Sequence, residues 1–451
     1  MTQLGRRLQW IWISILAAVL LLALAGCKDG SGRGISGDNG QEAAPSSQGQ
    51  KQQEQEPPQE EPDKTQPLPG SAGEVENGNL PSNSKTEAAV TELMSGMTVK
   101  EKIGQLVLVG LEGTKMDETS LKLIKDYQVG GFIFFKDNIT STQQSVKLFN
   151  ELKQANAVNP VPLWLSIDEE GGRVTRFPEE YVKLPSSGKV GSQQNRELTK
   201  RVGGLIAEKV SGLGLNMVFA PVLDINSNPN NPVIGDRSFG SSADVVSEQG
   251  IASMKGIQES GVVPVVKHFP GHGDTSVDSH LGLPVVEHDL KRLHKMELVP
   301  FKQAIDEGAD VVMVAHLLMK SIDPDTPSSY SKPVINDLLR EEMGFKGVVI
   351  TDDMTMGAVS GNTDVGEASV KSILAGSNIV LIGHEYDMEI AVIQALTDAV
   401  EKGVISEEML DDRVRTTLVL KQKYQLNDEP VKAPNVERLN QKTKQVLEEM
   451  K

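Results

Sequence analysis

The sequence predicts an α/β protein with a single (β/α)8 barrel, the TIM-barrel architecture, behind a long N-terminal extension. Three observations lead to this expectation. Between residues 87 and 425, short apolar runs rich in β-branched residues alternate with longer helical patterns. There are eight such runs. Six of the eight have Asp or His at or next to their carboxyl end, and barrels with a functional site carry polar residues at the carboxyl ends of their strands.

The first 26 residues have the pattern of an export signal. Arg6 and Arg7 form a basic start, residues 10–24 are nearly all apolar, and Leu-Ala-Gly precedes Cys27. This order is typical of a cleaved signal peptide, and Leu-Ala-Gly-Cys resembles the bacterial lipobox. We therefore expect residues 1–26 to be a lipoprotein signal peptide and a lipidated Cys27 to hold the protein on the extracytoplasmic face of the cell membrane. An uncleaved membrane helix is the alternative, although the run is short for a span of about 20 residues.

Residues 27–86 predict a disordered linker. The segment is rich in Gln, Glu, Gly, Ser and Pro and has few apolar residues to bury, so burial cannot offset the chain entropy lost on folding. About 60 residues of flexible chain have a root-mean-square span of roughly 40 Å. Such a tether would let an anchored domain reach the inner layers of a cell wall, and a passive spacer is the alternative.

The barrel domain is expected at residues 87–425, followed by a charged helical tail at residues 426–451. Its strands are predicted at residues 103–110, 130–135, 163–168, 217–225, 262–268, 310–316, 347–351 and 379–384. Alternation of strands with helices indicates parallel pairing, and near-continuous apolar strands indicate burial on both faces. An open doubly wound sheet would carry a Gly-rich phosphate-binding turn after an early strand, and the sequence has no such turn.

The polar residues at the strand ends predict a site at one mouth of the barrel. They are Asp168, Asp224, His268, His316, Asp352 and His384.

Composition narrows the class of ligand. The formal net charge is −17, whereas a nucleic-acid binder normally presents a basic patch. Aromatic residues make up 4%, which disfavours a stacking platform for single strands. An acidic surface is compatible with a neutral substrate such as a sugar. With Cys27 as the single cysteine, an internal disulfide and a thiolate metal cluster are excluded.

The segment KHFPGHGDTSVDSHLGLP, residues 267–284, carries the strongest chemical signal. Asp278 and His280 lie two residues apart in a Gly-containing loop, where the carboxylate could orient the imidazole and stabilise its protonated form. Such a pair can donate a proton and then take one back. Zinc held by histidines of this region is the alternative. The His-x-x-x-His spacing is a weak signal in a Gly-rich loop, so we expect no metal and no cofactor.

Three further segments complete the candidate site. In GVVITDDMTMG, residues 347–357, Asp352 could attack an anomeric carbon, while one of the two Asp residues could cap the following helix. In SIDEEGGRVTRF, residues 166–177, Asp168 and an Arg could share sugar hydroxyls. NPVIGDRSFG, residues 231–240, places Arg237 after the fourth strand.

Together these segments resemble glycoside hydrolase family 3, in its β-N-acetylglucosaminidase branch, from MTVKEKIGQL at Met97 through the final barrel unit. KHFPGHG followed by Asp-Ser-His is specific to that branch. The resemblance implies that Asp352 is the nucleophile and that His280 is the acid/base, assisted by Asp278. It also implies a set of residues that hold the N-acetylglucosaminyl ring: Asp168, Arg176, Arg237, Lys267 and His268.

The expected function is hydrolysis of terminal non-reducing N-acetylglucosamine residues with retention of configuration, through a glycosyl–enzyme intermediate. The expected partners are a muropeptide or other N-acetylglucosamine oligosaccharide and the membrane, with no nucleic acid, and the protein is expected to be a single-domain monomer. Chitin fragments are an alternative substrate. Phosphorolysis, another sugar specificity within family 3, and a non-catalytic sugar-binding lipoprotein remain alternative functions.

Overall fold

The structure, a computed structural model, describes residues 83–279 and 282–451. The chain divides into the units Met1–Val75 and Glu76–Lys451, and all described residues belong to the second. The expected signal peptide, Cys27, His280 and the linker up to residue 82 lie outside the described residues. Residues 83–86, predicted as the end of the linker, instead begin helix α2 (Asn83–Ser95). This helix buries Val90 and Met94, which gives the segment an apolar face to pack.

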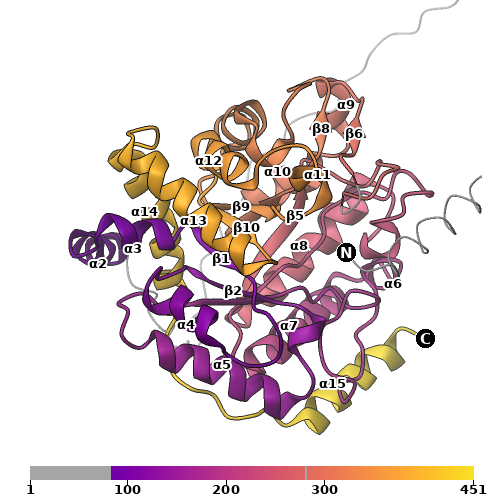
Figure 1. Ribbon diagram of the computed structural model, residues 1–451. Coiled ribbons are helices and arrows are strands. Elements are labelled where there is room, and N and C mark those ends of the chain that lie inside the picture. Colours follow the sequence, from indigo (N-terminus) through magenta and orange to yellow (C-terminus); the bar gives the residue numbers. More distant parts are fainter. Residues whose placement is uncertain (1–82, 280–281) are drawn as a thin grey trace, which may run out of the picture. The chain divides into compact units, whose positions relative to one another are not determined.

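Eight parallel strands close into a barrel in the order β1-β10-β9-β7-β5-β4-β3-β2 (Figure 1). Their bounds are β1 (Val107–Val109), β2 (Gly131–Phe134), β3 (Trp164–Ile167), β4 (Met217–Val218), β5 (Val263–Phe269), β7 (Val311–Val314), β9 (Val348–Asp353) and β10 (Ile379–Ile382). Each strand falls at one of the predicted apolar runs. The predicted (β/α)8 barrel is therefore confirmed.

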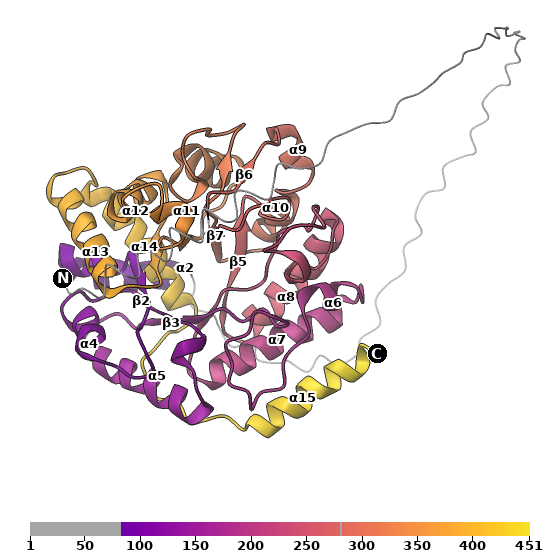
Figure 2. The ribbon, with the colours of Figure 1, turned by 45° about the vertical axis from the view of Figure 1, so that its right-hand side comes forward.

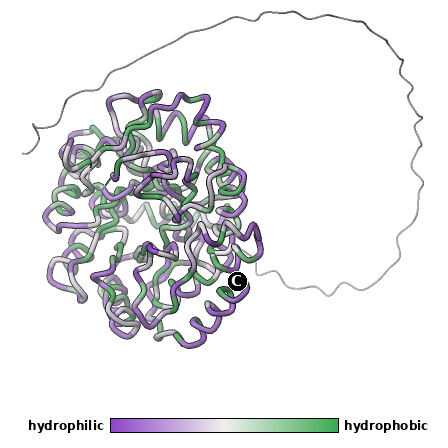
Figure 3. Tube along the Cα trace, turned by 90° about the vertical axis from the view of Figure 1, so that its right-hand side faces the viewer, coloured by the Kyte–Doolittle hydropathy of each residue, from purple (hydrophilic) through white to green (hydrophobic). Residues whose placement is uncertain are grey.

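The alternation of side chains along each strand divides the core into two parts. On β7, Val311 and Met313 belong to the cluster inside the barrel, whereas Val312 and Val314 belong to the larger cluster between strands and helices. Both faces of each strand are thus buried, which explains why the sequence runs are apolar throughout. Figure 3 shows the hydrophobic segments concentrated within the fold and hydrophilic segments along its outline.

Helices follow the strands and cover the barrel (Figures 1 and 2). Besides α2 they are α3 (Val99–Gly104), α4 (Glu118–Lys125), α5 (Thr142–Asn156), α6 (Ser187–Gly191), α7 (Arg196–Gly212), α8 (Ala243–Glu259), α9 (Leu290–Lys295), α10 (Val299–Asp306), α11 (Gly357–Ser360), α12 (Val365–Ala375), α13 (Tyr386–Glu401), α14 (Glu407–Lys423) and α15 (Val436–Glu449), with a π-helix, η4 (Pro333–Glu342). Many begin at a side-chain cap, as α5 does at Ser141 and α7 at Asn195. Such caps satisfy backbone N–H groups that the helix itself leaves free.

Three features differ from the sequence expectation or extend it. The fourth strand is much shorter than residues 217–225, since Pro221 cannot donate a backbone hydrogen bond, and only an isolated bridge joins Val222 to Lys267. A small parallel sheet of β6 (Val285–Val286) and β8 (Leu318–Met319) lies outside the barrel. In the predicted tail, α15 packs along α7 (Figure 2) and buries Leu439 and Val446, so this charged segment is folded onto the domain.

Candidate active site

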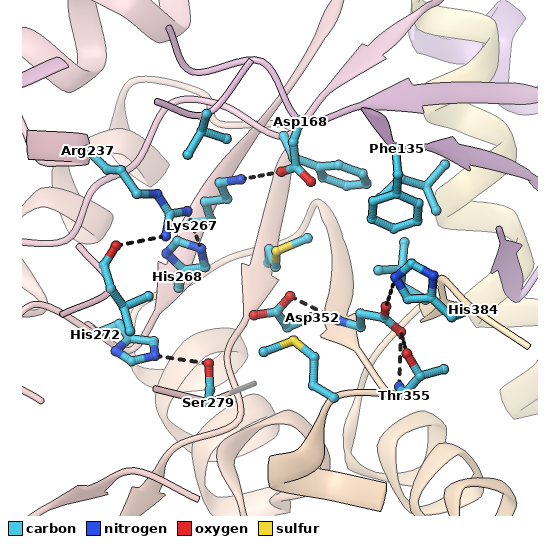
Figure 4. A pocket seen from close by; sticks show the side chains of 18 of the residues that line it. Phe135, Asp168, Arg237, Lys267, His268, His272, Ser279, Asp352, Thr355 and His384 are labelled. Atoms are coloured by element: carbon cyan, nitrogen blue, oxygen red, sulfur yellow. Dashed lines mark hydrogen bonds and ion pairs between the residues drawn. The ribbon is translucent and has the colours of Figure 1, made fainter. Parts of the chain in front are cut away.

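A cavity of about 410 Å³ lies at the carboxyl ends of the barrel strands (Figure 4). The five residues predicted to hold the sugar all line this cavity: Asp168, Arg176, Arg237, Lys267 and His268. The predicted nucleophile, Asp352, lines it as well. These residues come from the ends of four strands, β3, β4, β5 and β9, or from the loops after them. Barrel enzymes build their active sites from these same parts, the carboxyl ends of the strands and the loops that follow them. The cavity is also of the size that encloses a small ligand.

One wall of the cavity is a buried network of opposite charges. The Lys267 ammonium lies 2.6 Å from Oδ1 of Asp168 and 2.8 Å from Oε1 of Glu170. Arg176 approaches the other oxygen of Asp168 at 3.7 Å. Burial alone would lower the pKa of Lys267, but Asp168 and Glu170 outweigh it and raise the pKa. Lys267 is therefore a fixed cation, and Asp168 a carboxylate with room to accept hydroxyl groups from a ligand.

Glu170 holds the neighbouring cation in place from behind this wall. Its carboxylate accepts hydrogen bonds from Nε and Nη2 of Arg237 at 2.8 and 2.7 Å, and its side chain is 2% exposed. Burial would raise the pKa of Glu170, but Arg237 and Lys267 hold it far below the ordinary value. The same guanidinium lies 3.2 Å from Nε2 of His268. Glu170 was not among the predicted site residues, and its position two residues after Asp168 is the only signal for it in the sequence.

Asp224 fixes His268 from beneath the cavity. Its Oδ2 lies 2.6 Å from Nδ1 of His268, and its Oδ1 accepts the backbone N–H of His272 at 2.6 Å. Although burial favours the neutral acid, the adjacent imidazoles lower the pKa of Asp224. An anionic Asp224 keeps the proton of His268 on Nδ1 and leaves Nε2 toward Arg237 and the cavity.

The loop after β5 crosses this region closely because it contains glycine. A Cβ at Gly273 would lie 1.7 Å from the carbonyl oxygen of Ile225, so a side chain has no space there. Gly273 therefore permits a close approach between the loop after β5 and the loop after β4.

Asp352 lies on the side of the cavity across from His272 and Ser279 (Figure 4). Burial would raise its pKa, but His316, His268 and the backbone N–H of Asp353 together lower it. The carboxylate is thus held as an anion, the form that a nucleophile requires. Its Oδ1 accepts the backbone N–H of Asp353 at 2.9 Å.

The expected helix-capping role of the second Asp is wrong. Asp353 accepts from the N–H and hydroxyl of Thr355 and from the N–H of Gly383. The residue that precedes α11 at its N-cap is Met356, which makes no side-chain cap. Asp353 therefore ties the loop after β9 to the end of β10.

Only some of the polar residues predicted at the strand ends line the cavity. Asp168, His268, Asp352 and His384 line the cavity, whereas Asp224 and His316 are fully buried behind it. His316 lies 2.8 Å from the carbonyl oxygen of Asp353 and 2.6 Å from the hydroxyl of Ser329. At the rim, the His384 ring stacks on Phe135 with centroids 4.4 Å apart. The ends of the strands thus supply both contact residues and their supports.

The predicted acid/base loop is described up to Ser279. Asp278 is half-buried, and Ser279 is buried and lines the cavity. His280 lies outside the described residues, so its predicted role stays a prediction. Among residues 83–279 and 282–451, no group of three or more His, Cys, Asp and Glu side chains could hold a metal ion. Within the same part of the chain, no helix combines the length and apolar character needed to cross a bilayer.

Comparison with known proteins shows the family of this chain. Residues 98–420 match the model of the glycosyl hydrolase family 3 N-terminal domain. The chain belongs to glycoside hydrolase family 3. This family 3 protein is therefore a glycoside hydrolase, with a barrel whose cavity holds a buried carboxylate nucleophile candidate.

Its relatives carry related names. This family 3 chain is 34% identical over 326 residues to "Beta-hexosaminidase A" of Pseudoalteromonas piscicida, a match that covers 67% of the chain and 54% of the relative. It thus spans about half the length of that relative. A "Beta-hexosaminidase" of Xylella fastidiosa (strain 9a5c) is 37% identical over 285 residues, 62% of the chain and 83% of the relative.

Among solved structures, a family 3 β-N-acetylglucosaminidase from Paenibacillus sp. str. FPU-7 is similar to this chain. The two share 40% sequence identity with a TM-score of 0.74, over 79% of this chain and 69% of the other.

Proposed function

We propose that this family 3 hydrolase is an exported, membrane-anchored β-N-acetylglucosaminidase that removes terminal non-reducing N-acetylglucosamine from cell-wall fragments with retention of configuration. The observation that carries the proposal is the placement of an anionic Asp352 in the same 410 Å³ cavity as Asp168, Lys267 and Arg237. In this position, the proposed nucleophile and the groups that could bind hydroxyls would contact the same sugar. The names of the relatives support the choice of sugar.

In the proposed first step, an oxygen of Asp352 attacks C1 of the sugar and forms an ester. The bond from C1 to the leaving oxygen breaks, and the imidazolium of His280 donates its proton to that oxygen. Asp278 stabilises the imidazolium. In the second step neutral His280 takes a proton from water, the water oxygen attacks C1, and Asp352 is released as a carboxylate. Two inversions at C1 leave the β configuration unchanged.

The charged residues of the cavity wall would bind the hydroxyl groups of the sugar and orient it for the reaction. Asp168 and Lys267 are an acceptor and a donor for adjacent hydroxyls of the sugar ring, and their mutual contact of 2.6 Å keeps both in place before substrate arrives. Preorganised groups of this kind lower the cost of orienting substrate. Arg237 lies beside them as a further donor, and His268 lines the same cavity.

The proposed substrate is a muropeptide fragment, because the sequence carries an export signal with a lipobox-like Cys27 and a linker that could span part of a wall. The sugar chains of peptidoglycan would then be the N-acetylglucosamine polymer nearest to the enzyme.

Product identification tests the proposal. The purified protein is incubated with muropeptide fragments and, separately, with chitin oligosaccharides, with and without inorganic phosphate. We expect free β-N-acetylglucosamine as the first product, a higher kcat/KM on the muropeptides, and no dependence on phosphate. Formation of N-acetylglucosamine 1-phosphate would contradict hydrolysis, and a clear preference for chitin fragments would contradict the proposed substrate.

A further inference from the structure

The side chains of His272 and Ser279 face each other at the cavity, across from Asp352 (Figure 4). Nε2 of His272 lies 3.3 Å from the hydroxyl oxygen of Ser279. The two residues are 1% and 2% exposed and both line the cavity. Neither has a role in the steps proposed above, so the contact calls for an explanation.

The hydrogen bonds around His272 indicate which of its ring nitrogens carries the proton. The Thr275 hydroxyl donates to the carbonyl oxygen of His272 at 3.0 Å and lies 2.7 Å from its Nδ1. Because that hydroxyl has one proton to donate, it accepts from Nδ1–H. Burial also lowers the pKa of His272, against the opposing effect of Asp224. The imidazole is therefore neutral, with the lone pair of Nε2 directed at the hydroxyl of Ser279.

His272 is itself firmly held. Its backbone N–H donates to Asp224 at 2.6 Å, and its carbonyl oxygen also accepts from the side-chain amide of Asn231 at 2.8 Å. The acceptor that faces Ser279 thus belongs to a part of the site fixed by buried hydrogen bonds.

Ser279 is bound on its other side to the segment that follows the nucleophile. Its carbonyl oxygen accepts the N–H of Ala358 at 3.1 Å, and Ala358 belongs to α11, the first helix after Asp352. One residue therefore joins the loop after β5 to the loop after β9. In the sequence this residue lies between Asp278 and His280.

We propose that His272 and Ser279 are a pair of positioning residues that set the geometry of proton donation relative to Asp352. The inference rests on the function proposed above and goes beyond it, because it assigns the control of proton donation to the hydrogen bond between His272 and Ser279. Loss of the hydrogen bond should weaken protonation of the leaving group and leave attack by Asp352 intact.

The dependence on the leaving group distinguishes this role from a general structural one. Alkyl or sugar leaving groups need a proton in the transition state, and a general acid contributes about 10²- to 10⁴-fold. A nitrophenolate leaves without that help. The ratio of kcat/KM for an N-acetylglucosaminyl disaccharide to kcat/KM for the nitrophenyl N-acetyl-β-glucosaminide therefore reports on proton donation alone, since kcat/KM includes only the steps up to loss of the leaving group.

The test compares Ser279→Ala, His272→Asn and His272→Gln. The Gln amide reaches the position of Nε2 and can still bond Ser279, whereas the Asn amide reaches only the position of Nδ1. Ser211→Ala and His294→Asn serve as controls, because Ser211 is an exposed serine on α7 and His294 pairs with Glu342 at the surface. Thermal unfolding of each variant checks that it is folded.

We expect Ser279→Ala and His272→Asn to lower kcat/KM about tenfold or more on the disaccharide and less than about twofold on the nitrophenyl glycoside. His272→Gln and both controls should keep the parent ratio. An equal loss on both substrates, or a loss on neither, would overturn the positioning role while leaving the proposed function standing. A parent enzyme that released N-acetylglucosamine from neither substrate would overturn both.

Discussion

Glu170 and Arg237 form a two-point ion pair behind the wall of the cavity, with N–O distances of 2.8 and 2.7 Å. The same carboxylate contacts Lys267. A single buried acid thus fixes two of the cations that line the cavity, without itself lining it.

Replacement of this acid should harm both stability and binding. In Glu170→Gln, Arg237 loses its ion-pair partner and Lys267 keeps only Asp168. Removal of one member of a buried pair costs roughly 3–5 kcal/mol. We expect a lower free energy of unfolding by denaturant and a fall in kcat/KM of about tenfold or more. Glu259→Gln, which disrupts an exposed pair with Lys200, should change stability by no more than about 0.5 kcal/mol. Equal behaviour of the two variants would contradict the role of Glu170.

A second buried acid predicts a pH-dependent stability. Burial, with help from Glu112, Asp353 and Asp117, raises the pKa of Glu389 to about 8, and Oε2 of Glu389 is buried without a hydrogen-bond partner. The folded state then keeps a proton that the unfolded chain releases near pH 4.5. Stability should therefore fall as the pH rises from about 5 to 8.

Glu389→Gln removes this penalty. We expect the variant to match the parent in free energy of unfolding near pH 5 and to exceed it by roughly 2–4 kcal/mol near pH 8. Glu401→Gln, an exposed change on the same helix α13, provides the control and should show no such trend. A difference that stayed constant over this pH range would refute the raised pKa.

The proposed membrane anchor at Cys27 predicts that a variant without this cysteine changes location. Cys27→Ser removes the thiol that would accept the lipid, so the variant should leave the membrane fraction and lose labelling by a fatty-acid precursor. Ser47→Ala in the linker should keep both properties. A Cys27→Ser protein that remained in the membrane fraction would exclude lipidation as the anchor.

The fold could be predicted from the sequence because each barrel strand is apolar on both faces and is followed by a helix. The predicted sugar-binding residues Asp168, Arg176, Arg237, Lys267 and His268 do meet in one cavity with Asp352, since strand ends converge whatever the details of the loops. The buried acids that hold these residues in place could not be predicted from the sequence. The contact of Glu170 with Arg237 spans 67 positions and that of Asp224 with His268 spans 44, and only the folded loops define such pairs.

Local geometry explains the remaining differences. Asp353 was expected to be a candidate helix cap, but the N–H of Gly383 at the end of β10 competes for its carboxylate. The small sheet of β6 and β8 involves two residues from each strand, too few to leave a periodic pattern. Helix α15 was read as a charged tail because its buried face depends on α7, which lies more than 200 residues earlier in the chain.

Removal of the nucleophile should nearly abolish turnover. Asp352→Ala takes away the group that would form the ester, so kcat should fall by at least ~10³. Asp306→Ala, an exposed change on α10, should retain the parent kcat. Activity of the Asp352 variant close to that of the parent on an aryl N-acetylglucosaminide would refute the assignment.

Trapping of the covalent intermediate tests the central claim most directly. A fluorinated N-acetylglucosaminyl fluoride, which forms the ester quickly and releases it slowly, is incubated with the protein, and the digested peptides are examined by mass spectrometry. The account predicts one added glycosyl group on the peptide that contains residues 347–357, located at Asp352 and absent from Asp352→Ala. A label on another residue, or none while the parent enzyme is turning over substrate, would contradict it.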